Sequence, residues 1–409
     1  MTGKKYYAKV YERTSSRTMT LWTDIKIEGF SKTINGGLGE IEIQLARSFD
    51  NYGEGEDIKL NNKVMIYVSG PALPPEGKLI YTGYISQINP YVDGHSEGVN
   101  IRCLGYISKF AVIPFISSTT NPTKTYDSQE ISGIVGDILA VTQETTIGFK
   151  RNDPNFVCNY TGSTISNTGV NATIRFPLKS LKEAMDICLD YSAVSATETN
   201  PFYYYLDANE TFYFRRKPGK ATHTFYFKKH VKKISVEKSM TEMRNYYYYW
   251  NGLQESDANK VAIFLTPSVA SQNIDLYGLR WEVLEGRIND DTTDGQAFGT
   301  KAIYRALSNN AVPILKADIE IADIGTDAKS GYVIENIEPG DTCKILNLPD
   351  TVNSIFNNNM TITKVDYSLG KVNIELTLQE DLSKRIVDKE NLQSQLNQVQ
   401  LPSTFTEVS

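Results

Sequence analysis

Side chains that commonly carry catalysis or bind metals are few in this chain. It contains three histidines and four cysteines, namely His95, His223, His230, Cys103, Cys158, Cys188 and Cys343. The cysteines are widely spaced and no two form a C-x-x-C pair, so the sequence predicts neither a zinc site nor a disulfide framework. We expect four reduced and mostly buried thiols. The histidines stand in polar or strongly basic surroundings, which leaves little material for histidine-based catalysis.

Known catalytic and metal-binding motifs do not supply a function either. The sequence has no nucleophile elbow, H-E-x-x-H motif, Walker A loop or kinase signature. Asp290–Gly295 fits a calcium loop at its first, fifth and sixth positions, but Thr292 fills the third and Lys301 the twelfth, where a glutamate is needed. A helix N-terminus with acidic residues explains this stretch better. We therefore predict a protein that is not an enzyme, with no catalytic, cofactor-binding or metal-binding residues and no cofactor.

One run of positive charge is a candidate binding surface. Eight basic residues occur without an acid between them: Arg215, Arg216, Lys217, Lys220, Lys228, Lys229, Lys232 and Lys233. Together with nearby aromatic residues they could contact a polyanion, although the solvated face of a hairpin has the same pattern. The whole chain has a net charge of -6, which argues against a dedicated nucleic-acid binder.

Length and composition indicate a globular protein of several domains. The chain has 409 residues, of which 40% are hydrophobic and 22% charged. No apolar run approaches the roughly 18 residues that a membrane-spanning helix requires. The amino terminus lacks the apolar core of a secretory signal. There are 25 tyrosines, and because tyrosine favours half-buried strands and interfaces, the composition favours β structure with subunit contacts.

Alternating apolar residues predict β structure in residues 1–115. Strands are expected around residues 25–27, 41–45, 64–68, 79–88 and 99–106. Asn35–Gly39 lies between the early strands, and we interpret its glycines as a tight turn that needs positive φ.

Residues 116–235 are predicted to be an α+β region. A linker is expected over Ser117–Ser128, followed by a helix capped by Asp127 or Ser128, with Ile131, Ile134, Val135, Ile138 and Leu139 on one face. A second helix is expected to start at Pro177 and to bury Leu178, Leu181, Met185, Cys188 and Leu189. An aromatic hairpin follows, with strands at 202–206 and 211–214.

Residues 236–381 are predicted to return to β structure with one inserted helix. The helix begins near Asp294 and places Phe298, Ala302, Ile303, Ala306 and Leu307 on one face. Strands are expected at 314–321, 342–346, 361–367 and 372–378. The tail, 382–409, is divided between a short helix and disorder.

An internal similarity connects the two β regions. Residues 84–88 and 99–104 correspond to residues 361–365 and 372–377, and each second strand contains Val-Asn-Ile. Alternating strands resemble one another by chance, so a duplication and a coincidence both remain open at this point.

The order of these elements resembles the tail hub, or baseplate hub, proteins of tailed bacteriophages and related contractile injection machines. Four loose patterns carry the resemblance: residues 30–37; residues 79–85 with 99–106; the helix 178–191 with the aromatic hairpin; and the late helix with Pro313, a strand and residues 337–341. They span nearly the whole chain.

The resemblance implies a mainly β fold, with two tail-tube-like β-barrel domains at 1–115 and 236–381 flanking an α+β domain at 116–235, and a tail at 382–409. It also implies a structural virion protein at the tail tip or baseplate, made in the host cytoplasm. Three copies would adapt the sixfold tail tube to a threefold tip and continue the channel for DNA, which would pass without specific binding.

Expected partners are the tail tube or a distal tail protein ring, the tape measure protein, and a separate spike, fibre or tail-tip protein. Acidic residues that line the channel would repel DNA phosphates. The β pattern ends near Asp381, and we expect too few residues beyond it for a fused enzyme domain.

Two other functions are compatible with the same sequence. One is a carbohydrate-binding β-rich surface or adhesion protein, in which tyrosine-rich hairpins would supply stacking platforms. The other is a cell-wall or capsule hydrolase with an unrecognised carboxylate pair, because 48 acidic residues offer many pairs.

Overall fold

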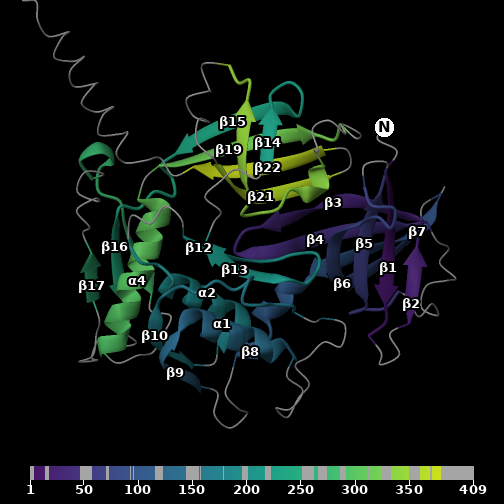
Figure 1. Cartoon of the computed structure of the whole chain (residues 1–409). Helices are drawn as coiled ribbons and strands as arrows, with labels where there is room; N and C mark the ends of the chain where they lie inside the picture. Colours follow the sequence, from purple (N-terminus) through teal and green to yellow (C-terminus); the bar gives the residue numbers. More distant parts are fainter. Residues whose placement is uncertain are drawn as a thin grey trace, which may run out of the picture.

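A computed structural model gives the fold of this chain (Figure 1). It describes residues 4–13, 18–46, 58–70, 73–92, 94, 96–115, 123–143, 156, 158–177, 179–195, 201–216, 223–250, 262–265, 274–285, 292–311, 313–324, 333–349, 360–368 and 371–378. The predicted C-terminal tail, His95, Leu178, Asp290, Asp291, Lys217 and Lys220 lie outside these ranges. No helix within the described residues is long and apolar enough to cross a membrane.

The first β region forms what we call the N-terminal β unit. Its strands are β1 (Lys5–Tyr11), β2 (Met19–Trp22), β3 (Ile25–Thr33), β4 (Gly36–Leu45), β5 (Lys63–Ser69), β6 (Lys78–Val92) and β7 (Glu97–Gly105). Alternate residues of these strands are buried, as in Val64, Ile66 and Val68 of β5. This period of two is what a sheet with one covered face requires.

The second β region forms the C-terminal β unit. Its strands are β14 (His223–Tyr226), β15 (Val231–Ser239), β19 (Ile314–Ala322), β20 (Thr342–Leu346), β21 (Met360–Ser368) and β22 (Lys371–Leu378). It also contains the short helix η4 (Ile334–Asn336). Val372, Ile374 and Leu376 of β22 are buried in alternation, as the sequence predicted.

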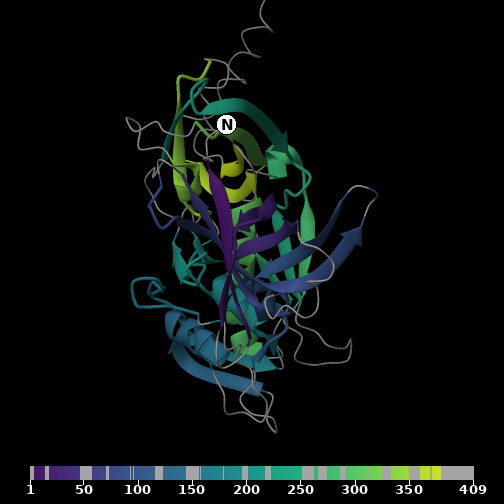
Figure 2. The ribbon, with the colours of Figure 1, turned by 90° about the vertical axis from the view of Figure 1, so that its right-hand side faces the viewer.

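One sheet runs through both β units. Its strand order is β15-β19-β22-β21-β3-β4-β7-β6-β5-β1-β2, so β21 of the C-terminal unit pairs with β3 of the N-terminal unit. One hydrophobic core follows this sheet and contains residues of both units, among them Ile43, Ile101, Ile319 and Ile374. Figure 1 shows the C-terminal unit above the N-terminal unit, and Figure 2 shows the same stack from the side.

The middle region packs around two helices, α1 (Ile131–Ala140) and α2 (Leu181–Tyr191). It also contains η2 (Tyr106–Ala111), η3 (Val141–Gln143), β8 (Pro114–Phe115), β9 (Thr123–Glu130), β10 (Asn171–Pro177), β11 (Lys179–Ser180), β12 (Phe202–Leu206) and β13 (Phe212–Arg216). All five expected residues of the first helix are buried, and the aromatic hairpin forms as β12 and β13. The expected mainly β chain with an α+β middle region is confirmed.

The hydrophobic core of the middle region also takes in elements from later in the chain. These are α4 (Thr292–Asn310) and β16 (Tyr246–Trp250), which forms a small sheet with β17 (Ala262–Leu265) and β18 (Trp281–Glu285). Phe298, Ile303 and Leu307 of α4 are buried beside α2 residues. Figure 1 shows α4 standing beside α2, away from the C-terminal β unit. β16 and α4 therefore pack on the middle region, although they follow β15 in sequence.

Several local predictions were wrong. Residues 123–128, expected as a linker, belong to strand β9, which pairs with β10. The cap of α1 is Glu130, whose carboxylate accepts from the Ser132 amide. The second helix begins at Leu181, because Pro177 ends β10 and Ser180 forms a capping box with Glu183.

Candidate assembly surfaces

The two β units contain the same irregular hairpin. The β6–β7 register shifts between Ile85 and Gln87, and the β21–β22 register shifts between Ile362 and Lys364. On either side of each shift the corresponding pairs agree: Ile88 faces Ile101 as Val365 faces Ile374. A β-bulge at the same place in both hairpins is a specific feature that alternation of apolar residues does not produce.

The bulge residues also make the same hydrogen bond. Ser86 Oγ donates to the Arg102 carbonyl at 3.0 Å, and Thr363 Oγ1 donates to the Glu375 carbonyl at 3.1 Å. In the aligned sequences Ser86 corresponds to Thr363, and Arg102 to Glu375. Each hydroxyl thus bonds the carbonyl of the residue that stands opposite the bulge.

The approach to each bulge is repeated as well. Asn61 donates to the Ile85 carbonyl at 2.8 Å, and Gly340 donates to the Ile362 carbonyl at the same distance. Asn61 has φ 65 and Gly340 has φ 87, so both turn residues adopt the left-handed conformation. The similarity seen in the sequence therefore extends to register, hydrogen bonds and turn geometry, which identifies an internal duplication.

Strand pairing repeats in the same order. β15-β19-β22-β21 in the C-terminal unit corresponds to β3-β4-β7-β6 in the N-terminal unit. Ile319 faces Ile374 as Ile43 faces Ile101. The described sheet thus contains two copies of one four-stranded motif, joined where β21 meets β3.

A buried ion cluster connects the two β units. Lys4 Nζ lies 2.7 Å from Asp323 Oδ2 and 2.6 Å from Glu335 Oε1. Tyr367 donates to the same Glu335 oxygen at 3.0 Å. Burial disfavours the Lys4 ammonium, but the hydrogen bonds and charges of the two carboxylates outweigh it and raise the Lys4 pKa.

A second contact, centred on Glu338 and called the clamp below, joins both units to the middle region. Lys32 Nζ lies 2.6 Å from Glu338 Oε1, and Tyr205 on β12 donates to the other oxygen of that carboxylate. Burial and the Glu338 charge raise the Tyr205 pKa. Glu338 belongs to the turn 337–341, which is part of the pattern that carries the resemblance, whereas its partners lie far away in sequence.

The face of the sheet opposite the core is polar and contains many charges. Its carboxylates are Glu28, Glu40, Glu42, Glu237, Asp318, Glu320, Asp366 and Glu375, and its cations are Lys26, Arg102, Lys233, Lys316, Lys364 and Lys371. Lys364 lies 2.8 Å from Asp366, and that hydrogen bond, with Glu375 and Asp318 nearby, raises the Lys364 pKa. β1 and β5 add Lys5, Lys9 and Lys63 to the same face, so it is a mixed surface in which neither charge predominates.

The β3–β4 turn docks on the middle region. Asn35 donates to the Tyr204 carbonyl at 2.9 Å, and its side-chain oxygen accepts from the Tyr204 amide at 3.3 Å. A Cβ on Gly37 would lie 2.8 Å from the Leu206 carbonyl oxygen. The expected turn is present, but its positive φ belongs to Asn35 (φ 55), and Gly37 is needed because another strand passes close by.

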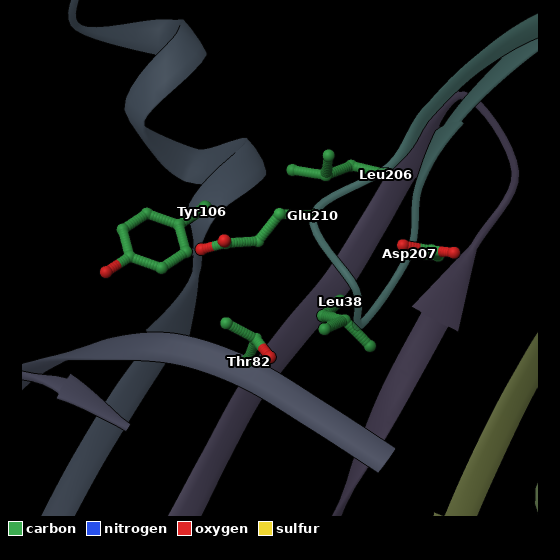
Figure 3. A pocket seen from close by; sticks show the side chains of 6 residues that line it. All are labelled: Leu38, Thr82, Tyr106, Leu206, Asp207 and Glu210. Carbon is green, nitrogen blue, oxygen red and sulfur yellow. The ribbon is translucent and has the colours of Figure 1, made fainter. Parts of the chain in front are cut away.

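The hollow shown in Figure 3 is a packed contact between the middle region and the N-terminal unit. Thr82 Oγ1 donates to the Ala208 carbonyl at 2.6 Å, and Glu210 lies 2.7 Å from Lys63 Nζ. Asp207, on the same turn, has a raised pKa because burial outweighs its hydrogen bonds. The hollow has no space for a water molecule. It positions the β12–β13 turn and is too small for a ligand.

A larger cavity of about 520 Å³ opens between α2, α4 and β18. Its lining is mixed and includes Lys179, Asp190, Tyr249, Phe298 and Arg305. None of these residues was predicted to have a function. Within the described residues, no group of three or more histidine, cysteine or acidic side chains could hold a metal ion.

The structure separates the predicted basic run. The guanidinium groups of Arg215 and Arg216 lie 4.7 Å from the rings of Tyr213 and Phe202. Lys232 and Lys233 are exposed on β15, on another unit of the fold. The two arginines therefore pack on the aromatic hairpin, and contact with a polyanion stays a prediction.

The cysteines and the tyrosines of strand β12 in the aromatic hairpin are buried. All four cysteines are free and buried, and burial raises the pKa of each thiol. Tyr203, Tyr204 and Tyr205 of the hairpin are buried too. Their rings form core and clamp contacts within the chain, so they do not offer the stacking platform that a carbohydrate site would need.

Comparison with solved structures identifies the fold. The 43 kDa tail protein of prophage MuSo2 from Shewanella oneidensis superposes with a TM-score of 0.58 at 10% identity, over 92% of this chain and 99% of that one. A tail protein from Neisseria meningitidis MC58 gives a TM-score of 0.56 at 10% identity, over 92% of this chain and 97% of that one. This chain therefore has a phage tail protein fold over nearly its whole length. No protein-family model and no curated protein sequence matches it.

Proposed function

We propose that this protein is a structural component of a bacteriophage tail, a hub at the tail tip or baseplate of which three copies form a ring. Each copy would supply two β-barrel domains, so three copies place six related units around one axis. Such a ring adapts a sixfold tail tube to a threefold tip.

The internal duplication carries this proposal. One chain contains the same bulged hairpin twice, with equivalent hydroxyl bonds at Ser86 and Thr363. Two equivalent units in one sheet are what a subunit needs to fill two neighbouring positions of a sixfold ring. The fold shared with prophage tail proteins supports the same assignment.

The polar sheet face would line a central channel for DNA. Its carboxylates and cations are interspersed, and several of the cations are paired, as in Lys364 with Asp366 and Lys371 with Glu320. A surface of this kind offers phosphates little net attraction, so DNA could slide past without specific binding.

Other tail proteins would bind the two ends of the ring. We propose the tail tube or a distal tail protein ring on one side, with the tape measure protein, and a spike, fibre or tail-tip protein on the other. The protein would reside in the virion, and its role would be geometric instead of enzymatic.

Light scattering on the purified full chain tests this function. Three copies of 45.9 kDa predict a mass of about 138 kDa. A mass of one chain at every concentration up to the solubility limit would refute the homotrimeric hub.

A further inference from the structure

The junction between the two β units is an edge-to-edge strand pairing. Residues Lys364–Ser368 of β21 pair antiparallel with Gly29–Thr33 of β3. The pairing covers apolar side chains: Phe30, Val365 and Tyr367 are at most 5% exposed. Tyr367 and Phe30 face each other, with ring centroids 5.3 Å apart.

The duplication assigns an equivalent to each side of this junction. The part of β6 equivalent to Lys364–Ser368 is 87–91, because Ile88 corresponds to Val365 through the shared bulge. The strand equivalent to β3 is β15, because Ile234 faces Ile319 as Ile27 faces Ile43. Within this alignment, Val236 on β15 occupies the place of Phe30.

Both equivalent edges are open within the described part of the chain. Residues 87–92 of β6 pair with β7 on one side, while β5 ends its pairing at Tyr84. β15 pairs with β19 on one side and is the first strand of the sheet. A strand edge with free amide and carbonyl groups is a template for another strand.

The apolar residues at these open edges are also only partly covered. Ile88, Ile234 and Val236 pack against the core but stay half-buried, whereas the equivalent residues Val365, Ile27 and Phe30 are buried. A strand placed on each edge would cover them as β3 and β21 cover each other.

We propose that β15 of one copy pairs antiparallel with residues 87–91 of β6 in the next copy, repeating the β21–β3 junction between chains. In this register Glu237 lies opposite Asn89, as Ser31 lies opposite Asp366 within the chain. The contact is head-to-tail, so it closes a ring in which every junction between units is alike. The number of copies, three, rests on the proposed function.

Pro90 is compatible with this pairing and limits it. Proline cannot donate a ladder hydrogen bond, so within sheets it stands at edges. Pairing at residue 90 therefore lacks one hydrogen bond that Tyr367 can make at the equivalent position. The remaining contact relies more on burial of Ile88 and Val236.

Cysteine crosslinking in the full chain tests the register. Asn89 and Glu237 are both exposed, and residues opposite each other in antiparallel strands have the Cα separation that a disulfide needs. The variant N89C/E237C should shift most of the protein to trimer-sized bands on non-reducing gels. The native cysteines are buried and should not contribute.

The matched control is E42C/E237C. Glu42 is exposed on the same polar face, but β4 is flanked by β3 and β7, so it cannot lie beside β15 of another copy. This variant and each single variant should show no trimer-sized band, whereas an equal band in the control would contradict the proposed register.

A second variant distinguishes loss of the interface between copies from loss of folding. V236E should keep its cooperative melting and lose the trimer mass, while V112E, at a side chain 78% exposed on another unit, should keep both. A protein that is trimeric by light scattering but gives no N89C/E237C crosslink overturns this interface and leaves the hub proposal standing. A wild-type protein that is monomeric overturns both, and a trimeric V236E overturns the interface.

Discussion

Replacing Gly340 by alanine should destabilise the protein far more than an ordinary glycine replacement. Gly340 has φ 87, and a Cβ at this position would lie 2.5 Å from Cζ and 2.6 Å from Cε2 of Tyr203. Tyr203 is 1% exposed, and its hydroxyl accepts from Arg215 Nε at 3.2 Å. The ring cannot move aside without disturbing the clamp between the C-terminal unit and the middle region.

Two costs add at this position. An alanine in the left-handed conformation costs about 1–2 kcal/mol, and overpacking a buried contact costs about 1–3 kcal/mol more. We expect Gly340→Ala to lower the free energy of unfolding by about 3 kcal/mol. The control is Gly169→Ala, because Gly169 has φ 70 but nothing within 4 Å of the new Cβ, so it should cost only about 1 kcal/mol.

Urea denaturation followed by circular dichroism measures both variants on the same scale. The reasoning is refuted if the two midpoints fall by the same amount, since only the Tyr203 contact distinguishes the two sites.

Three further predictions concern single contacts, one between the two β units, one within the middle region and one within the C-terminal β unit. Lys4→Met should lower the free energy of unfolding by about 3 kcal/mol, because it leaves the Glu335 carboxylate buried and without its cation. Since the folded-state pKa of Lys4 is raised, the stability that Lys4 contributes is present below its unfolded pKa and is lost as the pH rises through the folded value. Denaturation of both proteins at pH 7 and above pH 10.5 tests this. Glu130→Ala should lower the free energy of unfolding by about 2 kcal/mol, because it removes the hydrogen bonds that this carboxylate accepts from Ser132 and Thr168. Burial raises the pKa of the Glu130 carboxyl, but these hydrogen bonds lower it by more. The stability difference between wild type and variant should therefore vanish as the pH falls through the folded-state pKa, and a difference that stays the same in acid would contradict this. Thr363→Val should cost about 1 kcal/mol by removing one hydroxyl bond, whereas Thr363→Ser should restore it, as measured by urea midpoints.

The sequence predicted the periodic elements well because their signals are local. The apolar face of α1 and the alternation in β22 follow from spacing alone, and both are present. The sequence similarity between residues 84–104 and 361–377 covers the two hairpins that contain the bulges at Ser86 and Thr363. The bulge itself has no signature in the sequence of these residues, so its position can be seen only from the strand register of the structure.

The clamp residues could not be predicted in the same way. Lys32 and Glu338 are 306 positions apart, and nothing in either neighbourhood indicates the other. Residues 337–341 have a turn pattern in the sequence, but the role of this turn as the place where three regions meet depends on tertiary contacts. The packing of α4 on α2 is another such contact, because an amphipathic face specifies burial without specifying the partner.

Electron microscopy of the purified protein, with class averages viewed along the ring axis, tests the central claim most directly. The account predicts threefold particles in which six similar β units surround a central hole, with the middle regions as three outer lobes. Particles with two β units and no hole, at concentrations where the chain is folded, would contradict it.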